Sequence, residues 1–423
     1  MNQIRFLVVN PLWPRPAHSI RAANIVLFEL ISELARTNGV HVTFLKINKY
    51  NDEPHPTAED EEGIALLRKQ GVDVLPVLTL PPTPPKRSAL NRVLFTELSD
   101  FYPEIIFQQL AKDLILSHKP DVLFIPWTEW CTSLCADIPV LKFAYYGNPD
   151  HKSALAMTEF NYQHGTIGFF KYLAQKFFYK KLEKFHLKEI KKYEILGDVA
   201  LNDAQYYIEH GHKNAFYIQN LWIDRFGEEW RQKRLTLGEE GVPVIIANIG
   251  KLGGTANTHG LEILGRDFLP ALRRAMNGKK YGINLFGAGS PHPAIVKNLE
   301  SPEVRMRGFV DDIDGEMLAS RIFLCLNNAS DYKVGHTRYL HAWSLGCCVV
   351  AHKDAALSMP EIVHGENALL GKDVDEIANL IAKALFDPQL LSKIGEGGYR
   401  TFKKYFTAAS VVPEILKRIK MRL

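Results

Sequence analysis

The sequence predicts an α/β protein built from two domains, each folded around a doubly wound parallel sheet. Its 423 residues exceed what one hydrophobic core normally supports, so two domains are expected. Short apolar segments alternate with longer segments whose apolar residues recur at helical spacing, which is typical of parallel sheets. This alternation begins at the N-terminus and restarts near residue 244, which indicates one sheet in each half.

The composition narrows the class of protein. Hydrophobic residues make up 46% and charged residues 23% of the chain, as in soluble globular proteins. No apolar run reaches the roughly 18 residues that cross a bilayer, and the N-terminus lacks the pattern of a secretion signal. The net charge of +4 is too small to indicate a nucleic-acid partner. We therefore expect a cytoplasmic protein that does not bind nucleic acid.

The cysteines are expected to be structural thiols. Cys347 and Cys348 are adjacent in an apolar run, which predicts buried thiols in a strand. Cys131 and Cys135 have no second pair of ligands at zinc-site spacing, so no metal site is predicted.

In the first half, strands are expected at residues 4–9, 40–45, 121–125 and 141–146, with helices at 19–34 and 105–116. Ser19 is the predicted N-cap of the first helix. The proline-rich run from Leu78 to Lys86 predicts an extended surface loop without regular structure.

In the second half, strands are expected at residues 244–247, 281–286, 322–326 and 347–351, with a helix near 337–345. A further helix should turn Leu261, Leu264, Phe268 and Leu272 toward the core. The polar stretch 225–241 is interpreted as a linker. We thus expect domains of residues 1–224 and 225–409, with a helix over about 410–423 crossing back onto the first domain.

Three turns in the second half each follow a strand and precede a helix, where parallel sheets bind ligands and helix N-termini favour phosphate. These turns contain Asn248, Gly250 and Lys251; Gly287 and Gly289; and Lys333, Gly335, His336, Thr337 and Arg338. Glycine permits a close approach of the backbone, and the cations Lys251 and Arg338 suit a diphosphate. On residues alone, the turns fit either a bound nucleotide diphosphate or an ordinary scaffold.

The second half resembles glycosyltransferase family 4, retaining enzymes with the GT-B fold of two facing Rossmann-like domains. The matching segments, in order, are 248–251 with Asn257 and the helix at 268–272; 286–289; 304–310; 337–342 leading into 346–350; and 360–363 followed by 365–370. Residues 201–203 and 218–224 resemble the preceding strand and hinge. The resemblance implies a nucleotide-sugar donor on the second domain and an active site in a cleft between the domains. It assigns donor contacts to the turn residues above and to Arg307, Gly308 and Phe309, in the segment that frames the base.

The chain departs from the family at two positions. Where the family carries two glutamates eight positions apart, counted back from Gly346, this sequence has Lys333 and His341. His341 can accept a hydrogen bond from a ribose through a neutral ring nitrogen, whereas Lys333 reverses the charge near the sugar. The departure implies either an unusual donor or a loss of activity. We favour an active enzyme because Lys251 and Arg338 remain.

The resemblance implies catalysis by stabilisation of the departing diphosphate. Lys251 and Arg338 are the candidates for this role, with His336 as a possible helper, and neither a cofactor nor a divalent metal is expected. The triplets 312–314 and 373–375 have the Asp-x-Asp pattern of a metal site. Because each precedes a helix, we interpret both as helix caps.

The first domain is expected to hold the acceptor. Family members often place a histidine after a mid-domain strand, near the donor sugar, which here selects His151 and its neighbour Asp150. The alternative is a turn in which Asn and Asp side chains bond the local backbone. Further candidate acceptor contacts are Arg15, His18, Arg21 and Glu129.

Residues 168–193 predict a basic amphipathic helix in which aromatic residues interleave with lysines. Such a helix can lie on an anionic membrane, or it can pack one face on its own domain and leave the lysines in solvent. The first alternative places the protein at the inner face of the membrane and implies a lipid-linked or envelope glycan as acceptor.

The sequence therefore predicts a hexosyltransferase-type glycosyltransferase (EC 2.4), retaining and metal-independent. It would move a sugar from a nucleotide-diphosphate sugar to a glycan or lipid-linked acceptor in cell-surface polysaccharide or glycoconjugate synthesis. One alternative is a catalytically silent protein of the same fold that binds carbohydrate or a partner. Another is a nucleotide-sugar epimerase, which needs acidic and basic groups flanking the sugar. No paired carboxylates are recognised at the predicted strand ends.

Overall fold

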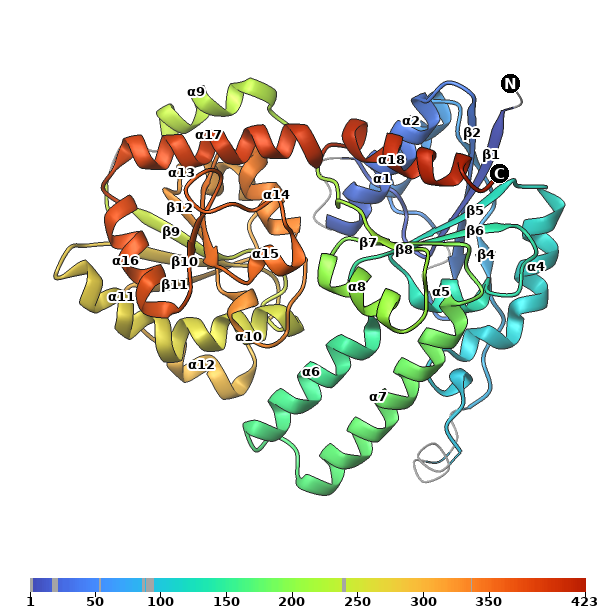
Figure 1. The fold of residues 1–423 in the computed structure, drawn as a ribbon, viewed down its shortest axis with the longest axis horizontal. Coiled ribbons are helices and arrows are strands. Elements are labelled where there is room, and N and C mark those ends of the chain that lie inside the picture. Colours follow the sequence, from blue (N-terminus) through green and yellow to red (C-terminus); the bar gives the residue numbers. More distant parts are fainter. Residues whose placement is uncertain are drawn as a thin grey trace. The chain divides into compact units, whose positions relative to one another are not determined.

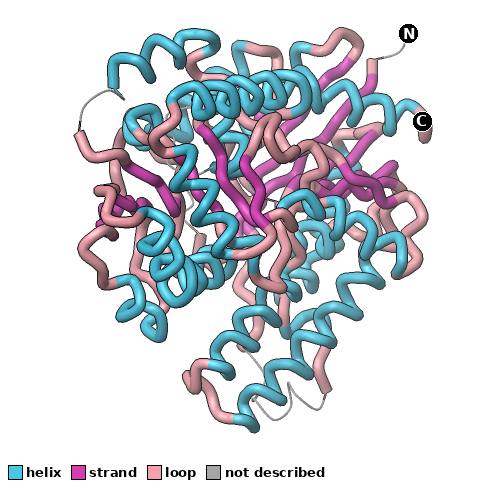
Figure 2. The backbone as a smooth tube through the Cα atoms, turned by 60° about the vertical axis from the view of Figure 1, so that its left-hand side comes forward, coloured by secondary structure: helices cyan, strands magenta, loops and turns pink. Residues whose placement is uncertain are grey.

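The computed structural model describes residues 3–16, 22–52, 55–85, 88, 95–237, 241–335 and 337–423. The chain divides into two compact units, residues 1–219 together with 408–423, and residues 220–407. Each unit is built around one sheet, and Figures 1 and 2 show the strands running between helices. Among the described helices, none combines the length and hydropathy needed to span a bilayer.

The first unit contains an eight-stranded sheet in the order β3-β2-β1-β5-β6-β7-β8, with β4 paired to β2. All of these pairings are parallel. The strands are β1 Ile4–Asn10, β2 Val40–Asn48, β3 Asp73–Val74, β4 Leu78–Thr79, β5 Val122–Pro126, β6 Leu141–Tyr146, β7 Ile195–Asp198 and β8 Ala215–Tyr217. The strand order reverses between β1 and β5, and parallel sheets bind ligands outside the carboxyl ends of strands at such a point.

The helices of the first unit cover this sheet, whose central strands are apolar and buried. They are α1 Ala22–Arg36, α2 Ala58–Lys69, α4 Gln108–Ser117, α5 Glu129–Leu134, α6 Asp150–Gln163, α7 Phe169–Ile190, α8 Leu201–Glu209 and α18 Ala408–Lys420. The C-terminal α18 lies along α1 (Figure 1), and Arg422 after it donates to Asn214 Oδ1 at 2.6 Å. The helices α6 and α7 form an antiparallel pair that extends beyond the sheet (Figure 1).

The second unit contains a six-stranded parallel sheet in the order β11-β10-β9-β12-β13-β14. Its strands are β9 Val244–Asn248, β10 Gly282–Phe286, β11 Val304–Gly308, β12 Ile322–Cys325, β13 Cys348–His352 and β14 Leu369–Gly371. The order reverses between β9 and β12, so the carboxyl ends of these two strands mark the expected ligand position.

The helices of the second unit are α9 Trp230–Leu237, α10 Thr255–Ile263, α11 Leu269–Met276, α12 Pro293–Leu299, α13 Ile313–Ala319, α14 Thr337–Ser344, α15 Ala355–Ser358, α16 Val374–Ala384 and α17 Pro388–Tyr405. A π-helical turn at Leu264–Phe268 joins α10 to α11. The four residues predicted to face the core from this stretch, Leu261, Leu264, Phe268 and Leu272, are all buried. The hydrophobic periodicity therefore identified the packed face of the helix.

The strands predicted from apolar runs are confirmed; their ends agree within about two residues, except that β2 runs to Asn48, beyond the predicted end at residue 45. Cys347 and Cys348 are buried, as predicted, and Cys348 lies in β13. The predicted N-cap Ser19 lies outside the described residues.

Two local predictions were wrong. Leu78 and Thr79, expected in an irregular loop, form β4 by pairing with Ile47 and Asn48, because the prolines begin only after Leu80. The stretch 225–241, interpreted as a linker, contains α9, whose Trp230 is buried. From the same helix, Arg234 donates to the carbonyls of Met317, Leu318, Ser320 and Gly346. The charged composition of residues 225–241 suggested a solvated segment, yet Arg234 donates hydrogen bonds to backbone carbonyl groups of the second unit.

Candidate functional site

The turns after β9 and β10 meet at the carboxyl edge of the six-stranded sheet. Gly287 has a φ of 143°, and a Cβ added there would lie 1.6 Å from the carbonyl oxygen of Gly250. Only a residue without a side chain permits this approach. Asn248 is buried and holds the two turns together, since its Nδ2 donates to Phe286 O at 2.8 Å and to Gly250 O at 3.2 Å. Gly289, in the second turn, faces open space.

Lys251 lies in the loop between β9 and α10, and its backbone is firmly held. Asn257 Nδ2 donates to Lys251 O at 2.6 Å, and Asn327 Nδ2 donates to Asn257 Oδ1 at 3.2 Å. These side-chain amides connect the loop after β9 to the loop after β12. The Lys251 side chain is exposed and forms no hydrogen bond or ion pair with the described part of the chain. Its ammonium group is therefore available to a ligand.

Arg338 occupies the first turn of α14, at the edge of the same sheet. Its side chain is partly buried, and it makes no hydrogen bond or ion pair to any residue that the structure describes. Burial lowers the pKa of its guanidinium. Buried charges in proteins are normally paired, so an unpaired and partly desolvated arginine at a helix N-terminus is arranged to bind an anion.

Lys333 lies beside a carboxylate that the sequence did not suggest. Its ammonium donates to Asp354 Oδ2 at 2.7 Å and to Asn328 O at 2.8 Å. Burial alone would raise the pKa of Asp354, but the hydrogen bond and charge of Lys333 outweigh it and lower the pKa. The side chain of Asn328 is buried and bonds both backbone groups of Val334, which fixes the loop that carries Lys333. The positive charge at position 333 is thus balanced locally.

His341 is paired in the same way. Its Nε2 lies 2.5 Å from Asp314 Oδ1, and Asp314 also accepts a hydrogen bond from Arg225. Burial would raise the pKa of Asp314, but the hydrogen bond from His341 and the charges of both partners lower it. The carboxylate therefore holds a proton on Nε2, and Nδ1 is the ring nitrogen that accepts a hydrogen bond when the ring is neutral.

Sequence reasoning missed the carboxylates Asp314 and Asp354, because each lies more than 20 residues from its partner along the chain. The helix-cap interpretation of the Asp-x-Asp triplets is confirmed for their first members. Asp312 accepts from Gly315 N at 2.8 Å, and Asp373 accepts from Glu376 N at 2.9 Å. The third residue of the first triplet is the one that orients His341.

The remaining predicted donor contacts lie at the ends of the same strands. Gly308 O accepts a hydrogen bond from Gly287 N at 2.8 Å, which fastens the end of β11 to the turn after β10. Arg307 lies 3.4 Å from Glu316, and Phe309 is exposed. Gly335 and Thr337 are partly buried beside the start of α14, and His336 lies outside the described residues. The structure thus gathers these residues at the sheet edge, while their contacts with a donor stay predictions.

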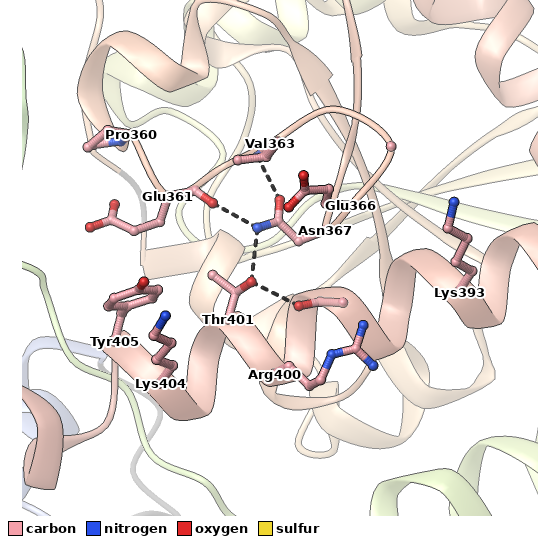
Figure 3. Close-up of a pocket in the computed structure, with 12 residues that line it drawn as sticks. Pro360, Glu361, Val363, Glu366, Asn367, Lys393, Arg400, Thr401, Lys404 and Tyr405 are labelled. Atoms are coloured by element: carbon pink, nitrogen blue, oxygen red, sulfur yellow. Dashed lines mark hydrogen bonds between the residues drawn. The ribbon is translucent and has the colours of Figure 1, made fainter.

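A separate pocket of about 720 Å³ lies in the second unit between residues 360–367 and α17. Figure 3 shows Asn367 fixing this loop: its Nδ2 donates to Glu361 O at 2.7 Å and to Thr401 Oγ1 at 3.0 Å. Cations from α17, Lys393, Arg400 and Lys404, line its other side. None of the predicted donor residues lines this pocket, so it does not coincide with the strand-end site.

In the first unit, Glu129 and Asp150 form a carboxyl pair at the ends of β5 and β6; Glu129 is buried, whereas Asp150 is exposed over part of its surface. The Tyr102 hydroxyl lies 2.9 Å from Glu129 Oε2 and 2.9 Å from Asp150 Oδ2. One hydroxyl proton can serve only one of these contacts, so the other requires a proton on a carboxyl group. Burial raises the pKa of both Glu129 and Asp150, which favours that proton. The sequence-based statement that no paired carboxylates stand at the strand ends was wrong, because Tyr102 reaches them from a distant segment.

Two buried histidines lie next to this pair. His186 Nδ1 lies 3.3 Å from Glu129 Oε2, and its Nε2 lies 3.0 Å from the Tyr207 hydroxyl. Burial lowers the pKa of His186 far below its usual value and that of His151 to about 4, so both rings are neutral at neutral pH. The Nδ1 of His151 is buried and has no hydrogen-bond partner among the described residues. A neutral ring with an unused nitrogen suits the predicted site role, which stays a prediction.

Arg15 has internal partners that balance its charge. Its guanidinium donates to Asp60 Oδ1 at 2.6 Å and to Glu59 Oε2 at 2.8 Å, both in the first turn of α2. The other two candidate acceptor contacts from this region, His18 and Arg21, lie outside the described residues. These ion pairs show that Arg15 stabilises the local structure. Its contact with an anionic acceptor stays a prediction.

The sequence of the second unit matches a known family. Residues 243–387, about a third of the chain, match the family described as "Glycosyl transferases group 1". The matched segment holds all of the turns described above. No curated protein matches the sequence significantly.

Solved structures share the fold over the whole chain. One is HepE from Anabaena in complex with UDP and glucose, with 16% identity, a TM-score of 0.62 and coverage of 99% of this chain and 100% of that one. Another is sucrose-phosphate synthase from Thermosynechococcus elongatus, with 12% identity, a TM-score of 0.66 and 99% coverage of both chains. A third is α,α-trehalose 6-phosphate synthase from Burkholderia multivorans, with 9% identity, a TM-score of 0.62 and coverage of 100% and 99%. The predicted GT-B architecture of two parallel-sheet α/β domains is confirmed.

Proposed function

We propose that the chain is a glycosyltransferase that takes a sugar from a nucleotide-diphosphate sugar. The observation that carries the proposal is Arg338, a partly buried arginine without a partner at the N-terminus of α14. It lies at the carboxyl edge of the sheet, within the segment that matches glycosyltransferases. A diphosphate leaving group supplies the anion that this arginine lacks. Lys251, also unpaired, adds a second cation at the same sheet edge.

The two departures from the family glutamates are compatible with an active enzyme. Lys333 has Asp354 beside it, and His341 has Asp314, so a carboxylate accompanies each altered position. The His341 ring, with Nε2 bound to Asp314, presents Nδ1 as an acceptor for a ribose hydroxyl. We infer that the donor site is rebuilt with other residues rather than abolished.

The finer assignments of donor and acceptor extend the same proposal. HepE has been crystallised with UDP and with UDP-glucose, so UDP-glucose is the first donor to test. We infer a glycan or lipid-linked saccharide as acceptor, and transfer with retention and without a divalent metal, in keeping with the family resemblance. Synthesis of a cell-surface polysaccharide or glycoconjugate is the corresponding pathway class.

The deciding experiment measures UDP affinity by titration calorimetry and UDP release from UDP-glucose. Arg338→Ala should weaken UDP binding about 10- to 100-fold, the range expected for loss of one charge-assisted hydrogen-bonded contact. Turnover should fall at least as much, because charge on the leaving diphosphate grows in the transition state. Chelation of divalent metals should leave turnover unchanged.

The matched control is Arg274→Ala, which removes an exposed arginine of α11 that is paired with Asp375. This variant should bind UDP like the unaltered protein. Equal affinity and turnover in Arg338→Ala would contradict the proposal. Binding of nucleotides without any sugar transfer, across a panel of donors and acceptors, would identify a catalytically silent protein instead.

A further inference from the structure

The tip of the α6–α7 pair exposes an unusual concentration of large apolar side chains. On α7, Phe170 is 86% exposed, Phe169 and Phe177 are each 52% exposed, and Leu173 is 45% exposed. Tyr162, at the end of α6, is also exposed and stacks on Tyr172 with ring centroids 4.2 Å apart. Scattered exposed apolar residues are normal, but a contiguous group on a protruding element marks an interaction site.

On the outward face of α7, apolar and cationic residues occupy different stretches of the helix. One face of the helix packs inward through Tyr172, Leu182, His186 and Ile190. At 100° per residue, the opposite face carries Phe170, Leu173 and Phe177 near the tip. The same face continues with Lys180, Lys181, Lys184 and Lys188 toward the sheet. On this outward face an apolar stretch near the tip is therefore followed by a lysine-rich stretch, while the exposed Lys171 and Lys176 lie beside the apolar stretch on other sides of the helix.

The dimensions of this surface match the interface of a lipid bilayer. From Phe170 to Phe177 the helix rises about 10 Å, and interfacial segments bury their apolar residues about 5–10 Å deep. On the outward face the lysines begin one turn further on, where Lys181 lies over the Phe177 ring, 4.6 Å from its centroid. Their ammonium groups would thus lie at the level of the headgroups when the tip is inserted.

Charge decides which partner fits this surface. Helix α7 carries six lysines and two glutamates, so its net charge is strongly positive. In the described structure Lys184 and Lys188 have no ion pair. A second copy of the chain would bring the same lysine-rich face against itself, whereas anionic lipid headgroups complement it.

We propose that the α6–α7 tip is a membrane-binding surface for anionic lipid. The side chains of Phe169, Phe170, Leu173 and Phe177 enter the boundary between headgroups and acyl chains, and the lysines that follow contact anionic headgroups. Helices α6 and α7 extend beyond the sheet (Figures 1 and 2), so their tip meets a surface without the strands of the first unit approaching it. This binding needs no nucleotide and stands independently of the proposed transferase activity.

The test is co-sedimentation of the full chain with vesicles of phosphatidylcholine, with and without phosphatidylglycerol. Binding should require the anionic lipid and should weaken as salt is added, because the lysine contribution is screened. Phe170→Ser should lower the vesicle partition constant about tenfold, since a phenyl group leaves the apolar boundary. Lys184→Gln should lower it about fivefold, the effect of one lysine near a charged surface.

The matched control is Phe386→Ser, which removes an exposed phenylalanine of the second unit. It should bind vesicles like the unaltered chain, and thermal unfolding should show that all variants remain folded. Failure to bind anionic vesicles would overturn the proposal, as would binding that is unchanged in Phe170→Ser. Self-association by sedimentation velocity, abolished by Phe170→Ser without any vesicle binding, would assign the tip to a second copy of the chain instead.

Discussion

Individual charges in the second unit fall into two groups. Lys251 and Arg338 have no partner in the described structure, while Lys333, His341 and Arg225 each contact a carboxylate. An unpaired cation at the end of a parallel sheet is available to a phosphate, whereas a paired one mainly stabilises the loop on which it lies. Whether a cation has a carboxylate partner therefore distinguishes the residues suited to bind a ligand from those that stabilise the surrounding loops.

The support function of Asp314 can be tested by Asp314→Asn. This change removes the negative charge of buried Asp314 that the partly buried His341 ring and the exposed Arg225 share, and it should lower the free energy of unfolding by about 1–3 kcal/mol. Urea unfolding of the full chain provides the measurement. The neighbouring Asp311 is exposed and forms no hydrogen bond or ion pair with any described residue, so Asp311→Asn is the control and should change stability by less than about 0.5 kcal/mol. Equal stability of the two variants would show that the His341–Asp314 contact contributes nothing.

At the scale of elements, the turns between strands and helices act together. The turn after β9 contacts the turn after β10 at Gly250 and Gly287, and Asn257 and Asn327 connect it to the loop after β12. The backbone of Lys251 is consequently fixed by residues from three separate strand ends. A change at one turn should therefore be transmitted to the others.

Gly287→Ala tests this coupling. Its Cβ would overlap the Gly250 carbonyl, so the turn bearing Lys251 must move, and UDP affinity should fall at least about tenfold. Calorimetric titration of UDP measures the loss. Gly289→Ala is the matched control: it also has positive φ, but it faces open space. In Gly289→Ala, backbone strain should lower the free energy of unfolding by about 1 kcal/mol, and UDP affinity should stay nearly unchanged. Similar affinities for the two variants would contradict the proposed coupling.

At the scale of the molecule, the two units differ in how they use ionisable groups. The first unit places carboxyl groups and histidines beside one another: Glu129, His151 and His186 are buried, and Asp150 next to them is exposed. In the second unit, Asp314 and Asp354 keep a lowered pKa through cationic partners. Acid should accordingly destabilise the first unit through its buried histidines and the second unit through these two carboxylates, because both kinds of group bind more protons in the unfolded chain.

His151 provides a prediction with a definite sign. Burial lowers its pKa to about 4 in the folded chain, whereas an unfolded histidine has a pKa near 6.5. The unfolded state binds more protons in this window, so stability falls as the pH drops from about 6.5 to 4. The slope is at most about 1.4 kcal/mol per pH unit for each histidine, and His186 acts in the same direction. In His151→Gln, stability against unfolding should fall less steeply between these pH values than in the unaltered chain, and thermal unfolding measures this difference.

The comparison of variants isolates His151 from its neighbours. The raised pKa values of Glu129 and Asp150 act in the opposite direction, but both groups remain in the variant and cancel in the difference. Glu183, Lys180 and Lys152, whose charges act on His151, likewise remain. His118→Gln changes an exposed histidine of the same unit that does not act on His151 and should keep the original slope. If His151→Gln keeps that slope too, His151 is not protonated on unfolding as proposed.

The sequence alone determined the two parallel sheets, the positions of most strands and the caps at Asp312 and Asp373. These features follow from local periodicity and from residues next to one another, and both are fixed by the geometry of strands and helices. Because parallel strands all end at one edge, the sequence also placed the predicted donor residues together.

Only the tertiary structure decided which of these residues carry unpaired charge. Contacts between distant segments give His341 and Lys333 their carboxylate partners. Such contacts also join Glu129 to Asp150 through the Tyr102 hydroxyl, and they bury Trp230 of α9. The same holds for α7, where the buried face defines an outward face on which apolar residues near the tip precede the lysines. Such contacts leave no periodic signal in the chain, because electrostatic pairing and burial depend on distance in space.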